Sequence, residues 1–164
     1  MVHVKDGMRT LFALLMLATL VMAQGPAHRK GVENRGDQAM GFSHTITTHH
    51  FSLLRNGGSI EVEADDPNDG SSRTAVQQHL RHIAKAFSAG DFDLPMFIHA
   101  KHPPGVSTMK RLRKHIEYKE AATANGAQLR ITATDPRAIA AIHDFLRFQI
   151  EDHHTADSTA VQDR

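Results

Sequence analysis

The sequence predicts an α+β fold, a two-layer sandwich in which a mainly antiparallel sheet carries helices on one face. Three observations predict it. Two stretches, 59–64 and 128–133, alternate apolar and polar residues in the way half-buried strands do. Each stretch follows an Asn-Gly pair, the strongest short signal for a hairpin. Each is then followed by apolar residues at helical spacing, so the order strand, strand, helix occurs twice.

The two halves share more than their order of elements. A shift of 69 positions carries Asn56-Gly57 onto Asn125-Gly126 and Asp66-Pro67 onto Asp135-Pro136. The Asp-Pro pairs mark the ends of the second strands, because proline cannot continue a strand ladder. We therefore predict a fold built from a duplicated ββα unit.

The first 23 residues have the features of an export signal. Lys5 and Arg9 precede the apolar run 11–22, and Ala23 ends a small-x-small cleavage pattern. A membrane-spanning helix needs about 20 apolar residues, which this run lacks. We predict a signal peptide at 1–23, export to the periplasm or secretion, and no membrane association after cleavage. A flexible lead-in at 24–42, a single α+β domain at 43–153 and a disordered tail at 154–164 follow.

Within the domain the elements are predicted in order. The first hairpin is followed by a helix whose stripe is Val76, Leu80, Ile83, Ala84 and Phe87. The apolar run 96–98 is a fifth strand or a buried loop, residues 103–105 turn the chain, and 106–115 form a short helix. The second hairpin precedes a helix whose stripe is Ile139, Ile142, Leu146 and Ile150.

Composition directs attention to histidine. The chain has 13 histidines and no cysteine, so no disulfide can stabilise it. Neutral imidazole is the commonest metal ligand in proteins. The formal net charge of +1 gives no basic field of the kind that gathers nucleic acid, so no nucleic-acid partner is expected. A metal ion or another small ligand is the expected partner.

Strand parity and helical spacing indicate which polar groups could meet. A turn at Asn56-Gly57 points His49 toward the helices, and the same rule places Glu120 on the covered face, where an unpaired carboxylate is costly. His79 and His82 share one flank of the first helix, and His143 borders the stripe of the second. The predicted metal ligands are therefore His49, His79, His82, His143 and Glu120, a set that suits zinc or copper.

Other interpretations of the same residues remain open. A histidine could serve as the axial ligand of a non-covalent haem, with Met96 or Met109 as the second ligand. The chain could instead be a cofactor-free interaction module that dimerises through sheet edges. A third alternative is a small metal-dependent hydrolase with Glu120 as base. Helical flank geometry favours the metal-binding protein, whereas the absence of a complete catalytic motif favours the cofactor-free module.

Four stretches, 40–42, 47–51, 90–93 and 141–146, resemble a group of small exported bacterial proteins, some of which carry the name aspartate carbamoyltransferase. The resemblance spans most of residues 24–164 and implies export and a shared fold, without an assigned function. The residues 71–74, Ser-Ser-Arg-Thr, are similar to the phosphate loop of carbamoyltransferases. That enzyme fold needs two α/β domains and about twice this length, so a helix cap at Ser72 or Thr74 explains the motif more simply.

Overall fold

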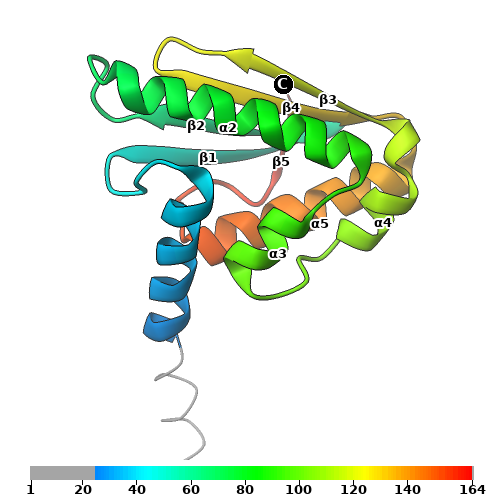
Figure 1. The fold of residues 1–164 in the computed structure, drawn as a ribbon. Coiled ribbons are helices and arrows are strands. Elements are labelled where there is room, and N and C mark those ends of the chain that lie inside the picture. The colour runs from blue at the N-terminus through cyan, green and yellow to red at the C-terminus, as the bar shows by residue number, and fades with distance from the viewer. Residues whose placement is uncertain (1–24, 164) are drawn as a thin grey trace, which may run out of the picture.

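A computed structural model describes residues 25–163, and the predicted signal peptide lies outside this range. The chain forms an α+β fold in which helices pack against a five-stranded mixed sheet (Figure 1), as the sequence predicts. Its strands are β1 (Thr47–Leu54), β2 (Gly57–Ala64), β3 (Ile116–Ala122), β4 (Gly126–Ala133) and β5 (Val161–Gln162). The sheet order is β3-β4-β2-β1-β5, and every neighbouring pair is antiparallel except β1 and β5.

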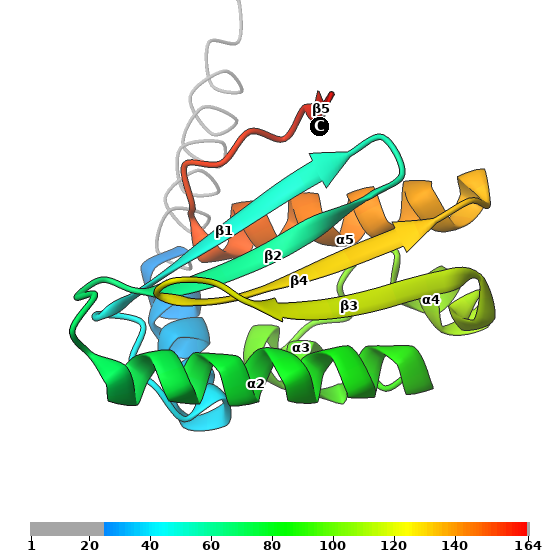
Figure 2. The same cartoon turned by 90° about the horizontal axis from the view of Figure 1, so that it is seen from above.

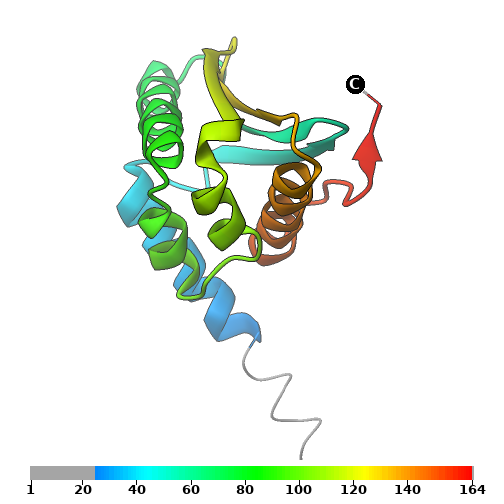
Figure 3. The same ribbon diagram turned by 90° about the vertical axis from the view of Figure 1, so that its right-hand side faces the viewer.

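Helices pack on one face of the sheet, which we call the covered face. They are a helix at residues 25–40, α2 (Gly70–Ala89), α3 (Asp93–His99), α4 (Val106–Arg111), the short 3-10 helix η1 (Arg113–His115) and α5 (Pro136–His153). One hydrophobic core joins the sheet to α2, α4 and α5. No helix within residues 25–163 is long and apolar enough to cross a membrane. In Figure 3 the C-terminal segment lies beyond α5, on the opposite side of the molecule from α2.

Both hairpin turns lie one residue earlier than the Asn-Gly signal predicts. Leu54 pairs with Gly57, so the first turn consists of Arg55 and Asn56. The glycine is needed inside the strand instead, because a Cβ on Gly57 would overlap the carbonyl oxygen of Ile131 on β4. Moving a turn by one residue shifts each strand partner by two positions. Because side chains alternate between the two faces of a strand, every residue keeps the face that was predicted for it. His49 therefore still faces the helices, as predicted.

The two halves match in register. The first hairpin pairs Phe51 with Ile60, and the second pairs Glu120 with Leu129, which is the same pairing after a shift of 69. Ile60 and Leu129, which the shift equates, pair with each other across β2 and β4. The ββα order is therefore present twice, while a common origin of the halves stays a prediction.

The helices of the two halves are exchanged. Helix α2 follows the first hairpin but packs mainly on β3 and β4, and α5 follows the second hairpin but packs mainly on β1 and β2 (Figure 2). Their starts also differ. Asp135 caps α5 directly, whereas α2 begins only at Gly70, capped by the Asp69 carboxylate, which accepts from the backbone N–H groups of Ser71 and Ser72. The cap predicted at Ser72 or Thr74 is thus supplied by Asp69.

Two segments that the sequence predicts to be loose are structured. Residues 25–40 form a helix, in which Val32 is buried and Arg35 Nε donates to the carbonyls of Phe97 and Ile98 at 3.0 and 2.8 Å. After α5 the chain runs back along β1, where the Asp157 carboxylate accepts from the Phe51 N–H at 2.9 Å. Contacts with residues far along the chain hold both segments, and composition alone does not reveal such contacts. The apolar run 96–98 belongs to α3 and is neither strand nor loop.

Candidate functional site

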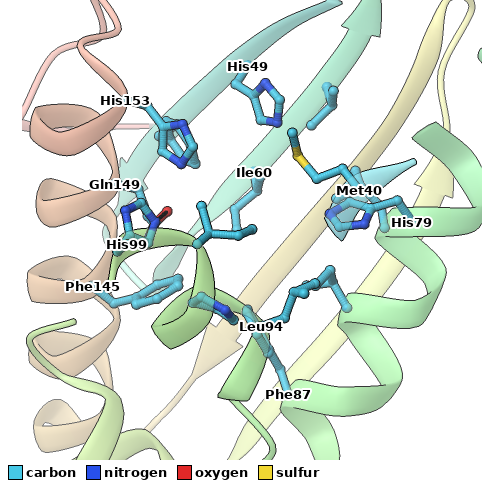
Figure 4. A pocket seen from close by; sticks show the side chains of 16 residues that line it. Met40, His49, Ile60, His79, Phe87, Leu94, His99, Phe145, Gln149 and His153 are labelled. Carbon is cyan, nitrogen blue, oxygen red and sulfur yellow. Dashed lines mark hydrogen bonds between the residues drawn. The ribbon is translucent and has the colours of Figure 1, made fainter. Parts of the chain in front are cut away.

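A pocket lies between the covered face of the sheet and the helices (Figure 4). Its volume is about 60 Å³, and side chains from β1, β2, α2, α3 and α5 line it. It adjoins an outer cleft of about 550 Å³ between the helix at 25–40, the start of β1 and the segment after α5. Three residues line both spaces, and we call them the junction: Met40, His49 and His153.

Four histidines reach the pocket from different elements. His49 occupies an inward position of β1, two residues before the core residue Phe51. His79 precedes the buried Leu80 on α2. His99 and His153 are the last residues of α3 and α5. The pocket is otherwise mainly apolar, with walls of Met40, Phe51, Ile60, Val62, Leu80, Ile83, Phe87, Leu94, Pro95, Ile98, Phe145 and Gln149.

The rings pack against one another in a defined arrangement. His49 and His153 stack with 5.6 Å between ring centroids and 11° between planes. The His99 ring meets His153 edge-on, at 5.0 Å and 89°. The ring of Phe42 lies edge-on to His79, with centroids 5.5 Å apart. The rings therefore touch through their faces and edges.

Three of these imidazoles are uncharged at neutral pH. Each keeps some solvent exposure, but protein surrounds the ring. Burial, with a smaller contribution from neighbouring imidazoles, lowers the pKa of His49 and His79 to about 4 and that of His153 to about 3. Within residues 25–163 these rings form no hydrogen bond to another group. Each therefore keeps one N–H donor and one nitrogen lone pair for a ligand.

His99 is bound on both sides and has another role. Its Nδ1 lies 2.6 Å from the Asp152 carboxylate and its Nε2 lies 3.0 Å from Oε1 of Gln149. Asp152 also contacts His28 Nε2 at 2.9 Å and Lys101 Nζ at 3.4 Å. Burial raises the pKa of Asp152, but the hydrogen bonds from His99 and His28 outweigh that effect and lower it. This network ties the helix at 25–40 and α3 to α5 behind the pocket.

The structure brings together only part of the predicted ligand set. His49 and His79 line the pocket. His82 is exposed on α2, and His143 Nε2 lies 2.9 and 3.0 Å from the carbonyls of Leu54 and Gly57, where it closes the first hairpin. Glu120 is on the covered face, as predicted, but outside the pocket, with Oε2 3.7 Å from Arg81 Nε.

Sequence reasoning missed His153 and Met40 as pocket residues, and it placed His99 beside a loop at the mouth of a site. His153 continues the α5 stripe, seven positions after Leu146, and this spacing could have found it. His99 and Met40 belong to helices that the sequence did not predict. Within residues 25–163, no group of three or more His, Asp or Glu side chains is placed to hold a metal ion.

No protein-family model matches the chain, and the searches of curated proteins and of solved structures likewise find no match. The functional argument therefore depends on the pocket itself.

The lowered pKa values predict a pH dependence of stability. In the unfolded chain these imidazoles titrate near 6.5, so below that pH the unfolded state binds more protons than the folded state does. The free energy of unfolding should fall between pH 6.5 and about 4, by up to about 1.4 kcal/mol per pH unit for each ring. Urea titrations at pH 7.5 and 5 measure it. His79→Gln should flatten the slope, and equal stability at both pH values would contradict the assignment.

Proposed function

We propose that this protein is an exported binding protein that holds a transition-metal ion at the junction, with His49 and His153 as ligands and His79 close by. One observation carries the proposal: three imidazoles without a hydrogen-bonding partner in residues 25–163 line one pocket. Their ring nitrogens are not among the buried unpaired atoms of residues 25–163, so a ligand from solvent can reach them.

The protonation state of the rings supports an ion as the ligand. A metal binds only the deprotonated imidazole nitrogen, so protons normally compete with the metal for a histidine near neutral pH. Rings whose pKa lies at about 3 or 4 have no such competition above pH 5. The inner pocket, at about 60 Å³, is far below the roughly 300–1,000 Å³ of sites that hold organic ligands, so within it only an ion or water fits.

Binding an ion requires the rings to turn. Parallel rings direct their lone pairs along two parallel planes, so the stacked pair of His49 and His153 does not converge on one point. The terminal torsion of histidine is broad, so the rings can rotate at small cost. The outer cleft provides the room for this rotation and for the entry of the ion. We therefore expect metal binding to break the stack.

The experiment is a metal titration of the protein purified without a histidine tag. Zinc and copper should bind with a stoichiometry of one per chain and raise the melting temperature, because a ligand that binds only the folded state stabilises it. His49→Gln and His153→Gln should each weaken binding. The matched controls are His82→Gln on α2 and His102→Gln after α3, which are exposed and line neither the pocket nor the outer cleft.

Two outcomes would overturn the proposal. One is binding that the exposed-residue variants weaken as much as the pocket variants do, which indicates adventitious surface sites. The other is the absence of any stoichiometric metal or thermal shift. Haemin belongs in the same titration: a Soret band that depends on His49 or His153, without ion binding, would replace the ion by a haem lying in the 550 Å³ outer cleft.

A further inference from the structure

The junction contains one soft ligand in addition to its imidazoles. Met40 is the last residue of the helix at 25–40, and it lines both the pocket and the outer cleft, as only His49 and His153 also do. Figure 4 shows the side chains of Met40, His49 and His79 turned toward the same space. On the basis of the function proposed above, we infer that the junction is a copper(I) site with Met40, His49 and His153 as its ligands.

The chemistry of the three side chains selects this ion. A thioether is a soft ligand, and soft sulfur ligands select copper(I) over zinc, which prefers thiolate, imidazole and carboxylate. The chain has no cysteine to offer thiolate. Asp152, one carboxylate of the cleft wall, has its oxygens engaged by His28, His99 and Lys101. The junction itself offers one sulfur and two imidazole rings.

The charge of the ion points the same way. A thioether and two imidazoles bring no negative charge, so the ion keeps its full charge where the outer cleft meets the mainly apolar pocket. The cost of burying an ion in such surroundings rises steeply with its charge, and a monovalent cation is therefore much cheaper to accommodate than a divalent one. Copper(I) also accepts low coordination numbers.

The position of Met40 couples the ion to the N-terminal helix. The helix is attached to the rest of the protein through Val32 in the core, Arg35 on the end of α3 and His28 on Asp152. Met40 lies at its C-terminal end, where the chain turns toward β1. A bound ion would thus join this helix to β1 and α5 through three side chains.

The test compares copper(I) with zinc on the full protein, without a tag and without oxygen. Copper(I) is supplied from a colorimetric chelator that competes for it, and silver(I) serves as a redox-inert substitute. Met40→Leu keeps the volume and removes the sulfur. It should weaken copper(I) and silver(I) binding more than about tenfold, the smallest loss usual when a group supporting a metal site is removed. Zinc binding should not change. Met96→Leu on α3, outside the pocket, is the matched control.

The outcomes separate this inference from the proposed function. If zinc binds at His49 and His153 as tightly as copper(I) does, or if Met40→Leu binds copper(I) like the parent protein, the copper(I) assignment fails while the metal-binding function stands. If no metal binds, both fail. X-ray absorption of the copper(I) protein gives a second readout, in which one sulfur neighbour in the parent and none in Met40→Leu supports the assignment. Nitrogen neighbours alone in the parent overturn it.

Discussion

Replacing Gly57 with alanine should destabilise the protein by at least about 3 kcal/mol, because two costs coincide at this position. Gly57 has φ +141, a backbone conformation that side-chain-bearing residues rarely adopt. A Cβ here would also overlap the backbone carbonyl of Ile131 on the neighbouring strand, where no side-chain rotation can relieve the clash. Chemical denaturation of the parent and of Gly57→Ala measures the difference.

The matched control is Gly41, which has φ +78 but open space where a Cβ would lie. Gly41→Ala should cost only the left-handed conformation, about 1 kcal/mol. The difference between the two variants isolates the close approach of β2 to β4. An equal loss of unfolding free energy in the two variants would show that β2 and β4 can move apart easily. It would contradict the close packing described for Gly57.

Replacing Asp152 with alanine should cost about 3 kcal/mol, because one side chain holds several partners. The Asp152 side chain is 9 % exposed and contacts the almost completely buried His99 as well as His28. Alanine is the better helix former, and removing a negative charge near the C-terminus of α5 is favourable. Any loss must therefore come from the broken network. Urea unfolding at pH 7 measures it.

The control for this variant is Asp144→Ala on the same helix, where the exposed Asp144 pairs with Arg147 at 3.5 Å. Its stability should change by less than about 0.5 kcal/mol.

The contribution of Asp152 to stability should also depend on pH. Its folded pKa is lowered, so its contribution is present above the ordinary carboxyl pKa and is lost as the pH falls through the folded value. A difference between Asp152→Ala and the parent that persists in strong acid would contradict the ionised network.

The strand pattern predicted the sheet better than it predicted the turns. Alternation of apolar and polar residues at 59–64 and 128–133 reflects burial of one face of the sheet. This signal is local, because it depends only on residue type and on the two-residue period of a strand. The position of Gly57 reflects contact with a strand more than 70 residues away, which no local pattern contains. Parity survived because both turns moved by one residue, and the inward placement of His49 and Glu120 survived with it.

The site was harder to predict than the fold, for a related reason. A histidine beside an apolar stripe can serve as a hydrogen-bond donor, a surface residue or a pocket residue, and only tertiary structure decides among these roles. His143 contacts the backbone carbonyls at the end of the first hairpin, whereas His82 is exposed to solvent. Met40 reached the pocket because a polar segment folded as a helix, and that helix depends on partners far along the chain such as Phe97 and Asp152.

The exchange of α2 and α5 between the hairpins makes the two halves mutually dependent. Neither half can shield its own strands, so a polypeptide severed near residues 101–104 should yield pieces that stay unfolded apart and reassemble on mixing. The proposed metal site also depends on both halves. His49 and His153 originate from opposite sides of such a cut, so neither piece alone offers an incoming ion both rings.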